Sequence, residues 1–211
     1  TGRHCHSWRV GFEVHDQARA ALVTMRRPGA GRAQQRWRMA PPVDEQQGLL
    51  GAREPEAGAY PVVVGPGWGG VLVHECFGHG MEGDTIQRGT SIRATQMGQR
   101  VAAMGVTIVD SGIVPYSRGS FRVDDEGTPA QRTVLVQDGM LTGYMWDWLN
   151  ARLSGNRPTG NGRRNSYRDF PLCRMTNTYI EAGPHDPGSL IASIGRGLYC
   201  KNLGGGSVNP A

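Results

Sequence analysis

His74-Glu75-Cys76-Phe77-Gly78-His79 brings two imidazoles and one carboxylate into six consecutive residues. Neutral imidazole is a common ligand of Zn²⁺, and a glutamate beside such ligands can accept a proton from an attacking water. Residues 71–81 are predicted to form a helix, so the three groups would lie on one short element. The pattern favours a metal site, although the same residues could also be ordinary polar positions on a helix.

The spacing of the two histidines does not suit a regular helix. They are five residues apart, whereas H-E-x-x-H, the common zinc-peptidase pattern, places both on one face. At about 100° per residue, a five-residue step leaves the two rings about 140° apart around the helix axis. A π-bulge would absorb the extra residue, and Gly78 is the residue that best tolerates unusual backbone angles. We therefore predict a bulged or broken helix at Gly78.

The rest of the chain indicates an α+β fold with mixed or antiparallel sheets, against which the motif helix packs. Continuous β-branched residues at 60–64 and 106–109 indicate strands. The pair Asp138-Gly139 supplies the positive φ angles of a type I′ hairpin turn. Further predicted elements are a turn at 65–70, hairpin strands at 133–137 and 140–144, a strand turning helical over 144–153, a polar loop over 154–167, a strand at 175–181, a capped helix at 186–194 and a short strand at 198–201.

Charge and composition narrow the classes of function. The net charge is +5, but residues 1–40 hold eight Arg against two acids, so the remaining residues are slightly acidic. A nucleic-acid-binding protein is expected to carry its positive charge on the folded part, so we exclude a nucleic-acid partner. No apolar run reaches the roughly 20 residues of a membrane span. We expect no membrane segment and a cytoplasmic location.

The chain divides into two unequal parts. Residues 1–58 show little periodicity, and the Arg-, Gln-, Gly- and Pro-rich run over 26–42 cannot bury much apolar surface. We expect this first part to be partly disordered. From Ala59 onward strand and helix signals alternate, so residues 59–211 are predicted to be the folded core.

The motif and its neighbours resemble the signature of the TldD/PmbA metallopeptidases, an H-E-x-x-G-H followed by Leu/Met-Glu-Gly-Asp. Here that match runs over residues 74–84. Several other segments agree in family order, so the resemblance is specific and extends over about residues 48–211. These segments are 89–91, 98–101, 123–129, 158–165, 174–179, 197–199 and 204–208.

The resemblance implies an intracellular zinc protease. Members of the family trim leader peptides from modified peptide antibiotics and degrade small or unfolded polypeptides. A metal-bearing subunit pairs with a homologous subunit that lacks H-E-x-x-x-H, and this chain is similar to the metal-bearing, TldD-like side. By position, His74 and His79 are expected to bind Zn²⁺ and Glu75 to act as the general base. Expected partners are a peptide substrate and a homologous subunit in a homo- or heterodimer.

The chain departs from the family pattern at both ends. The family's third zinc ligand is a Cys beyond the segment that matches residues 204–208, and the sequence ends at Ala211 without it. Cys76 is a poor substitute, because it should point about 200° away from His74 on a helix. The family's long N-terminal domain also has no counterpart. We therefore expect a truncated chain, and the alternative function is a catalytically incomplete fragment that acts only as a binding or assembly subunit.

Other residues are lesser candidates. Glu82 could bind the metal or orient an imidazole from behind, and Asp84 could do the latter. Arg163 and Arg164 could bind a substrate carboxylate, the alternative being a surface or salt-bridged role. Candidates for pairing with a peptide as an added strand, with a plain tight turn as the alternative, are Gly204, Gly205 and Gly206.

Overall fold

The computed structural model describes residues 59–67 and 70–201. These residues fold around a four-stranded sheet with the strand order β4-β3-β2-β7, in which each neighbouring pair is antiparallel. The predicted α+β class with an antiparallel sheet is therefore confirmed. The strands are β2 (Ile108–Ser111), β3 (Arg132–Gln137), β4 (Met140–Leu141) and β7 (Thr178–Ile180).

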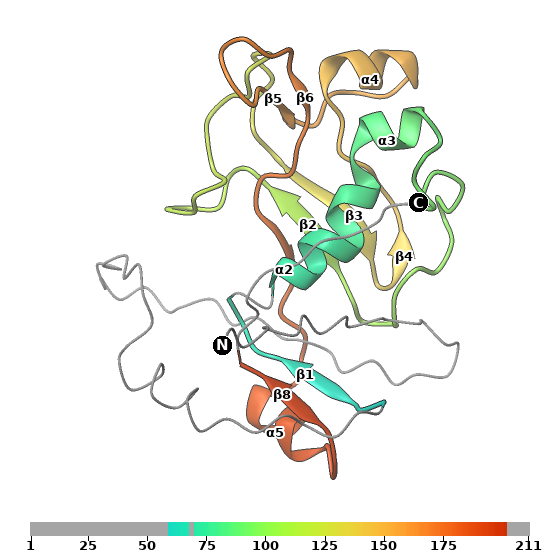
Figure 1. Cartoon of the computed structure of the whole chain (residues 1–211), viewed down its shortest axis with the longest axis vertical. Helices are drawn as coiled ribbons and strands as arrows, with labels where there is room; N and C mark the ends of the chain where they lie inside the picture. Colours follow the sequence, from blue (N-terminus) through green and yellow to red (C-terminus); the bar gives the residue numbers. More distant parts are fainter. Residues whose placement is uncertain (1–58, 68–69, 202–211) are drawn as a thin grey trace, which may run out of the picture.

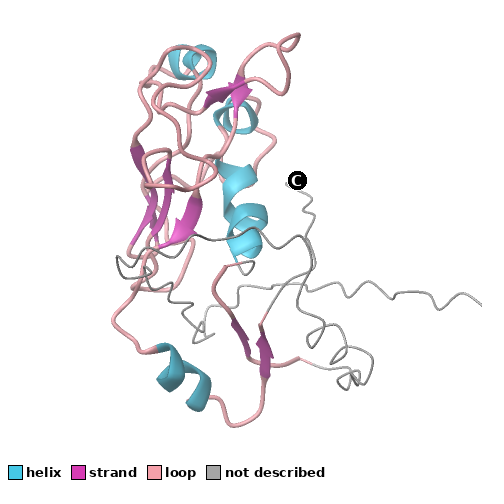
Figure 2. Cartoon of the chain, turned by 90° about the vertical axis from the view of Figure 1, so that its left-hand side faces the viewer, coloured by secondary structure: helices cyan, strands magenta, loops and turns pink. Residues whose placement is uncertain are grey.

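Two smaller strand pairs lie at opposite ends of this sheet (Figures 1 and 2). The pair β1–β8 is parallel and lies at the same end as α5, whereas the pair β5–β6 is antiparallel and lies at the end of α4. Their bounds are β1 (Val62–Val64), β8 (Leu198–Cys200), β5 (Gly162–Arg163), β6 (Leu172–Cys173), α4 (Trp148–Leu153) and α5 (Pro187–Ala192).

The motif lies on one irregular helix that runs alongside the sheet (Figure 2). It begins as α2 (Gly70–Val73), continues as the π-helical turn η1 (His74–Gly78) and ends as the 3₁₀ turn η2 (His79–Met81). Glu82 then adopts an extended conformation, and α3 (Gly83–Gln87) follows. The distortion that the five-residue spacing predicts is present, in the form of the π-helical turn.

The motif helix is fixed to the sheet through a shared apolar core. Met81, Ile108, Leu135, Leu141 and Met145 are all fully buried. Burying each such side chain contributes about 1.5–3 kcal/mol. The backbone N–H of Met145 also donates to the carbonyl of Met81 at 3.0 Å. The end of the motif helix is thereby tied to the chain that leaves β4.

The local turn and cap predictions are confirmed. The hairpin of β3 and β4 turns at Asp138 and Gly139, whose φ angles of 48° and 80° are both positive, as a type I′ turn requires. The side chain of Asp186 caps α5 by accepting from the backbone N–H of Ser189 at 3.0 Å. The strands expected at 60–64 and 198–201 are β1 and β8.

Several expected bounds are wrong, and the reasons are tertiary. The hairpin strand expected to reach residue 144 ends at Leu141. Beyond Leu141 the chain turns away from its partner strand β3, and Met145 pairs with Glu82 instead. The loop expected over 154–167 contains β5. The strand expected from residue 175 begins only at Thr178, because Thr176 bonds to a buried carboxylate.

No helix in the described part is long and apolar enough to cross a membrane. The predictions made for residues 1–58 and for Gly204, Gly205 and Gly206 lie outside the described residues.

Candidate metal centre

The π-helical turn brings the two motif imidazoles together. The ring centroids of His74 and His79 are 4.7 Å apart, and the ring planes meet edge to face at 89°. On a regular helix a five-residue step would separate the rings by about 140°. Because a π-turn takes one residue more than an α-turn, it restores a common face to side chains at this spacing.

Glu75 completes a compact group of three potential ligands. One ligand-type atom from each of His74, Glu75 and His79 lies within 4.8 Å of the others, and this is the one such group among the described residues. Glu75 Oε2 lies 4.0 Å from His79 Nε2. All three side chains are half-buried, so the group is neither sealed in the core nor fully exposed to solvent.

A second carboxylate contacts His79 on the opposite edge of its ring. Glu82 Oε2 lies 3.2 Å from His79 Nδ1, and the Glu82 side chain is only 5% exposed. Burial raises the pKa of Glu82, while the hydrogen bond and charge of His79 and the charge of Arg174 oppose that rise. An Nδ1–H that donates to Glu82 leaves the lone pair on Nε2, the nitrogen that faces Glu75.

The electrostatics of His74 favour the neutral ring. Burial lowers its pKa most, the neighbouring His79 lowers it further, and Glu75 and Asp110 oppose the shift. A neutral imidazole has a free lone pair, which metal binding requires. At neutral pH His74 is therefore in the form that can act as a ligand.

A glycine is needed at position 78 because a larger residue would clash with its neighbour, and not because of its backbone angles. Its φ and ψ of −56° and −59° are ordinary right-handed helical values, so the expectation that it absorbs an unusual backbone angle is wrong. A Cβ added to Gly78 would instead lie well inside van der Waals contact with Met175 Sδ. The glycine lets the segment before β7 pack directly against the π-turn.

A buried polar cluster lies behind the motif helix, and sequence reasoning missed it. Asp110 on β2 is 2% exposed. It accepts hydrogen bonds from Asn161 Nδ2 at 2.8 Å, from the backbone N–H and hydroxyl of Thr176 at 2.9 and 2.7 Å, and from the Thr178 hydroxyl at 2.7 Å. Four donors compensate the buried charge. The cluster joins β2, β7 and the loop before β5, and the charge of Asp110 acts on His74.

Comparison with known proteins identifies the family. The model of the PmbA/TldA metallopeptidase C-terminal domain matches residues 57–211. This chain belongs to that family. It is 49% identical over 160 residues to the metalloprotease TldD homolog of Haemophilus influenzae, and 48% identical to that of Buchnera aphidicola; each match covers 76% of this chain and 33% of the relative. The chain thus spans about a third of the length of these curated relatives.

The fold also matches a solved structure of the same family. TldE from Thermococcus kodakarensis superposes with a TM-score of 0.63 at 28% identity, covering 72% of this chain and 34% of TldE. The family resemblance inferred from the motifs is therefore confirmed.

The other candidate residues contact partners outside the group of three, and the proposed role of Asp84 behind an imidazole stays a prediction. Asp84 is buried and pairs with Arg88 Nη2 at 3.1 Å. The Arg163 guanidinium donates to the carbonyl of Met175 at 2.6 Å, and the Arg164 guanidinium donates to the carbonyl of Asp169 at 2.6 Å. The exposed Cys76 is not part of the three-residue group. The substrate-binding roles of the two arginines stay predictions.

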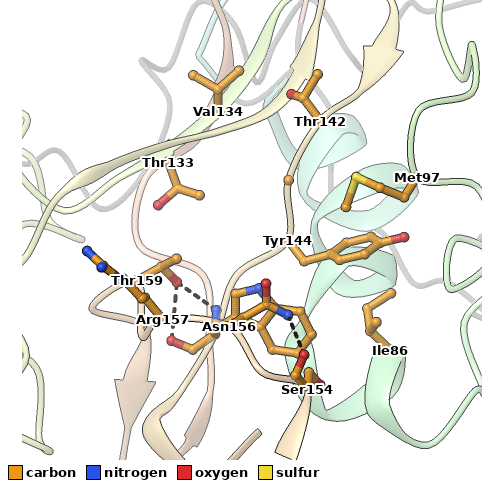
Figure 3. Close-up of a pocket in the computed structure, with 12 residues that line it drawn as sticks. Ile86, Met97, Thr133, Val134, Thr142, Tyr144, Ser154, Asn156, Arg157 and Thr159 are labelled. Carbon is orange, nitrogen blue, oxygen red and sulfur yellow. Dashed lines mark hydrogen bonds between the residues drawn. The ribbon is translucent and has the colours of Figure 1, made fainter. Parts of the chain in front are cut away.

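A groove of about 610 Å³ lies outside the group of three potential ligands. Thr133 and Arg157 line one side and Met97 and Tyr144 the other (Figure 3). None of the three grouped side chains lines it. No His, Cys, Asp or Glu is among the described residues that line the groove.

Proposed function

We propose that this chain carries the zinc-binding core of a peptidase that hydrolyses small, unfolded or leader peptides. The observation that carries the proposal is the group of His74, Glu75 and His79, whose ligand-type atoms lie within 4.8 Å of one another. Membership of a metallopeptidase family supports it. The metalloprotease names of the relatives imply a metal, and the donor set supports Zn²⁺ as that metal.

The donor set fits Zn²⁺. Imidazole and carboxylate are ligands of this ion, and atoms bound to one Zn²⁺ at about 2.1 Å lie at most about 4.2 Å apart. The observed limit of 4.8 Å is close to this, so a small rotation of one side chain would bring the set to binding distance. We assign His74 and His79 as the ligands. The hydrogen bond to Glu82, with Nε2 of His79 left free, supports that assignment.

Glu75 is the proposed general base. Zn²⁺ bound at this site would polarise the scissile carbonyl and acidify the attacking water. The Glu75 carboxylate would accept the proton of that water at Oε2 and deliver it to the leaving amine nitrogen. The Glu75 side chain is only 19% exposed, which limits its contact with bulk water during this transfer.

The substrate is proposed to be an extended peptide held through its backbone, which gives weak sequence preference. A homologous subunit is the proposed partner, and the proposed location is the cytoplasm. Similarity to relatives named TldD and to a structure of TldE supports a partner of the same family.

The second candidate function is that of a binding or assembly subunit without catalysis. Catalytic zinc sites commonly use about three protein ligands. If Glu75 is the base, the group found in the described part of the chain supplies two. A chain that binds a partner subunit but holds Zn²⁺ no better than an isolated pair of histidines would favour this function.

Zinc analysis and a peptide-cleavage assay on the wild type and Glu75→Gln test the proposal. We expect both proteins to bind Zn²⁺ equally, and the variant to cleave at least about 100-fold more slowly, because it has lost its proton acceptor. Glu181→Gln, in an exposed ion pair away from the centre, is the matched control. Equal cleavage by Glu75→Gln and the wild type would remove Glu75 from the mechanism. Loss of zinc from the variant would make Glu75 a ligand instead.

A further inference from the structure

We propose that Arg174 is a positioning residue of the metal centre, and that it acts by holding the Glu82 carboxylate against Nδ1 of His79. The inference rests on the proposed function, because it concerns the same imidazole. It adds a residue that the H-E-x-x-x-H motif does not contain, from a segment about 95 residues further along the chain.

The side chain of Arg174 contacts Glu82 from outside the motif helix. Its Nη1 atom lies 3.7 Å from Glu82 Oε2, the same oxygen that lies 3.2 Å from His79 Nδ1. The other oxygen, Oε1, is buried and has no hydrogen-bond partner. The buried carboxylate therefore depends on two partners, one on the motif helix and one on the opposite segment. A buried carboxylate that loses a cationic partner is poorly compensated, so it no longer has a defined orientation.

The backbone of Arg174 is fixed to the sheet. Its N–H donates to the carbonyl of Asn161 at 2.8 Å, and Asn161 Nδ2 donates to the carbonyl of Arg174 at 3.0 Å. The same Asn161 amide donates to Asp110, and Asn161 is 1% exposed. Arg174 Nη1 also donates to the carbonyl of Cys173 at 2.7 Å, which directs the guanidinium. The chain of contacts therefore leads from a buried strand to the ring of His79.

This arrangement gives Arg174 a role that a surface arginine lacks. A ligand imidazole is held in one tautomer and one orientation by the acceptor behind it, and changes at that acceptor commonly cost about 10–100-fold in metal affinity. Arg174 acts one contact further away. Its effect on metal binding should therefore depend on Glu82. The effect should vanish when residue 82 is no longer an anionic acceptor for the hydrogen bond from His79 Nδ1–H.

A direct role in substrate binding is the competing explanation. The Arg174 side chain is 44% exposed, so its remaining N–H groups could reach a substrate carbonyl. The two roles predict different effects. Loss of a positioning residue weakens zinc binding without any substrate present, whereas loss of a substrate contact raises KM and leaves zinc affinity unchanged.

Zinc affinity measured by competition with a chromophoric chelator separates these roles. The proteins are the wild-type chain, Arg174→Gln, Arg174→Lys, Glu82→Gln and the double variant Glu82→Gln/Arg174→Gln. We expect Arg174→Gln to weaken zinc binding about 10-fold. Arg174→Lys should lose less, because it keeps the cation, and the double variant should bind no more weakly than Glu82→Gln alone. Arg132→Gln, which removes an arginine–carboxylate pair elsewhere, should leave the affinity unchanged.

Each outcome decides something different. If the wild type itself binds no zinc, the proposed function fails. If the wild type and Arg174→Gln bind zinc equally well, the inference about Arg174 is overturned and the proposed function stands. The same conclusion follows if the effects of Glu82→Gln and Arg174→Gln on zinc affinity add in full. A rise in KM with unchanged zinc affinity would likewise overturn it. If Arg174→Gln fails to fold, Arg174→Lys, compared with and without Glu82→Gln, provides the test with a smaller expected effect.

Discussion

The motif helix and the segment that faces it, residues 158–178, contribute in different ways to the candidate metal centre. The helix carries the three grouped side chains within six residues of sequence. The facing segment supplies none of them, but Met175 packs against Gly78, Arg174 contacts Glu82, and Thr176 bonds to Asp110. The potential metal ligands are therefore close together in the sequence, whereas the contacts that hold them in position come from residues far along the chain.

The largest expected loss of stability tests how strongly the buried polar cluster around Asp110 holds the facing segment in place. Asp110→Ala removes the acceptor of four hydrogen bonds and leaves the buried Asn161 amide and the half-buried Thr176 with unpaired donors. We expect a loss of about 3 kcal/mol in the free energy of unfolding, measured by urea denaturation. Asp186→Ala, which removes the exposed N-cap of α5, should cost only about 1 kcal/mol. Equal losses would mean that the buried cluster does not hold the segment in place.

A smaller effect is expected where the two regions touch. Gly78→Ala forces a methyl group against Met175 Sδ. Because methionine is flexible, we expect a loss of about 1–2 kcal/mol and weaker zinc binding, measured by thermal unfolding and chelator competition. Gly78→Ala combined with Met175→Ala should be more stable than the sum of the single losses predicts. Gly195→Ala has open space around its added methyl group and is the neutral control. Full additivity would contradict the contact.

The titration of His74 measures how burial and neighbouring charges act on the motif helix. Because its pKa is lowered from 6.5, the native protein takes up this proton at a lower pH than the unfolded chain does. The stability that the neutral ring contributes is present above pH 6.5, and it is lost as the pH falls from 6.5 through the native pKa. NMR titration of the His74 Cε1–H in metal-free protein should give a midpoint below 6.5. A midpoint above that value would mean that Glu75 and Asp110 outweigh burial.

The smallest effect is expected at an ion pair that belongs to neither region. Arg132 Nη2 and Glu181 Oε1 are 2.6 Å apart, but their side chains are 40% and 38% exposed. Arg132→Gln should therefore change the free energy of unfolding by at most about 0.5 kcal/mol, with no change in zinc binding. A loss comparable to that of Gly78→Ala would remove the distinction between surface contacts and the facing segment.

The motif helix could be predicted in detail because its signal is local. The five-residue spacing of His74 and His79 is incompatible with a regular helix that binds one ion, and the π-turn is the structural answer. The hairpin at Asp138-Gly139 and the cap at Asp186 follow from rules that also act over a few residues. The reason for Gly78 could not be predicted, because Met175, which fills its empty side, lies about 97 residues away.

The facing segment could not be predicted because its polar residues suggest a loop. Asn161 lies between two glycines in a stretch of polar residues, yet it is 1% exposed. Its burial depends on Asp110, which is 51 residues earlier in the chain. Hydrophobic periodicity cannot predict a buried hydrogen bond between two polar residues so far apart in the chain. Arg174 is likewise visible in the sequence only as part of a family pattern, and its contact with Glu82 appears only in the fold.

The parallel pairing of β1 with β8 has a consequence for how the chain folds. Val62 pairs with Leu198, so this contact closes almost the whole described chain into one loop, whereas the β3–β4 hairpin closes across two residues. Loop closure costs more entropy as the loop lengthens, and non-local pairing slows folding. We expect the backbone amides of β1 and β8 to gain protection from hydrogen exchange after those of β3 and β4. The start of the motif helix would then be among the last parts of the molecule to become anchored.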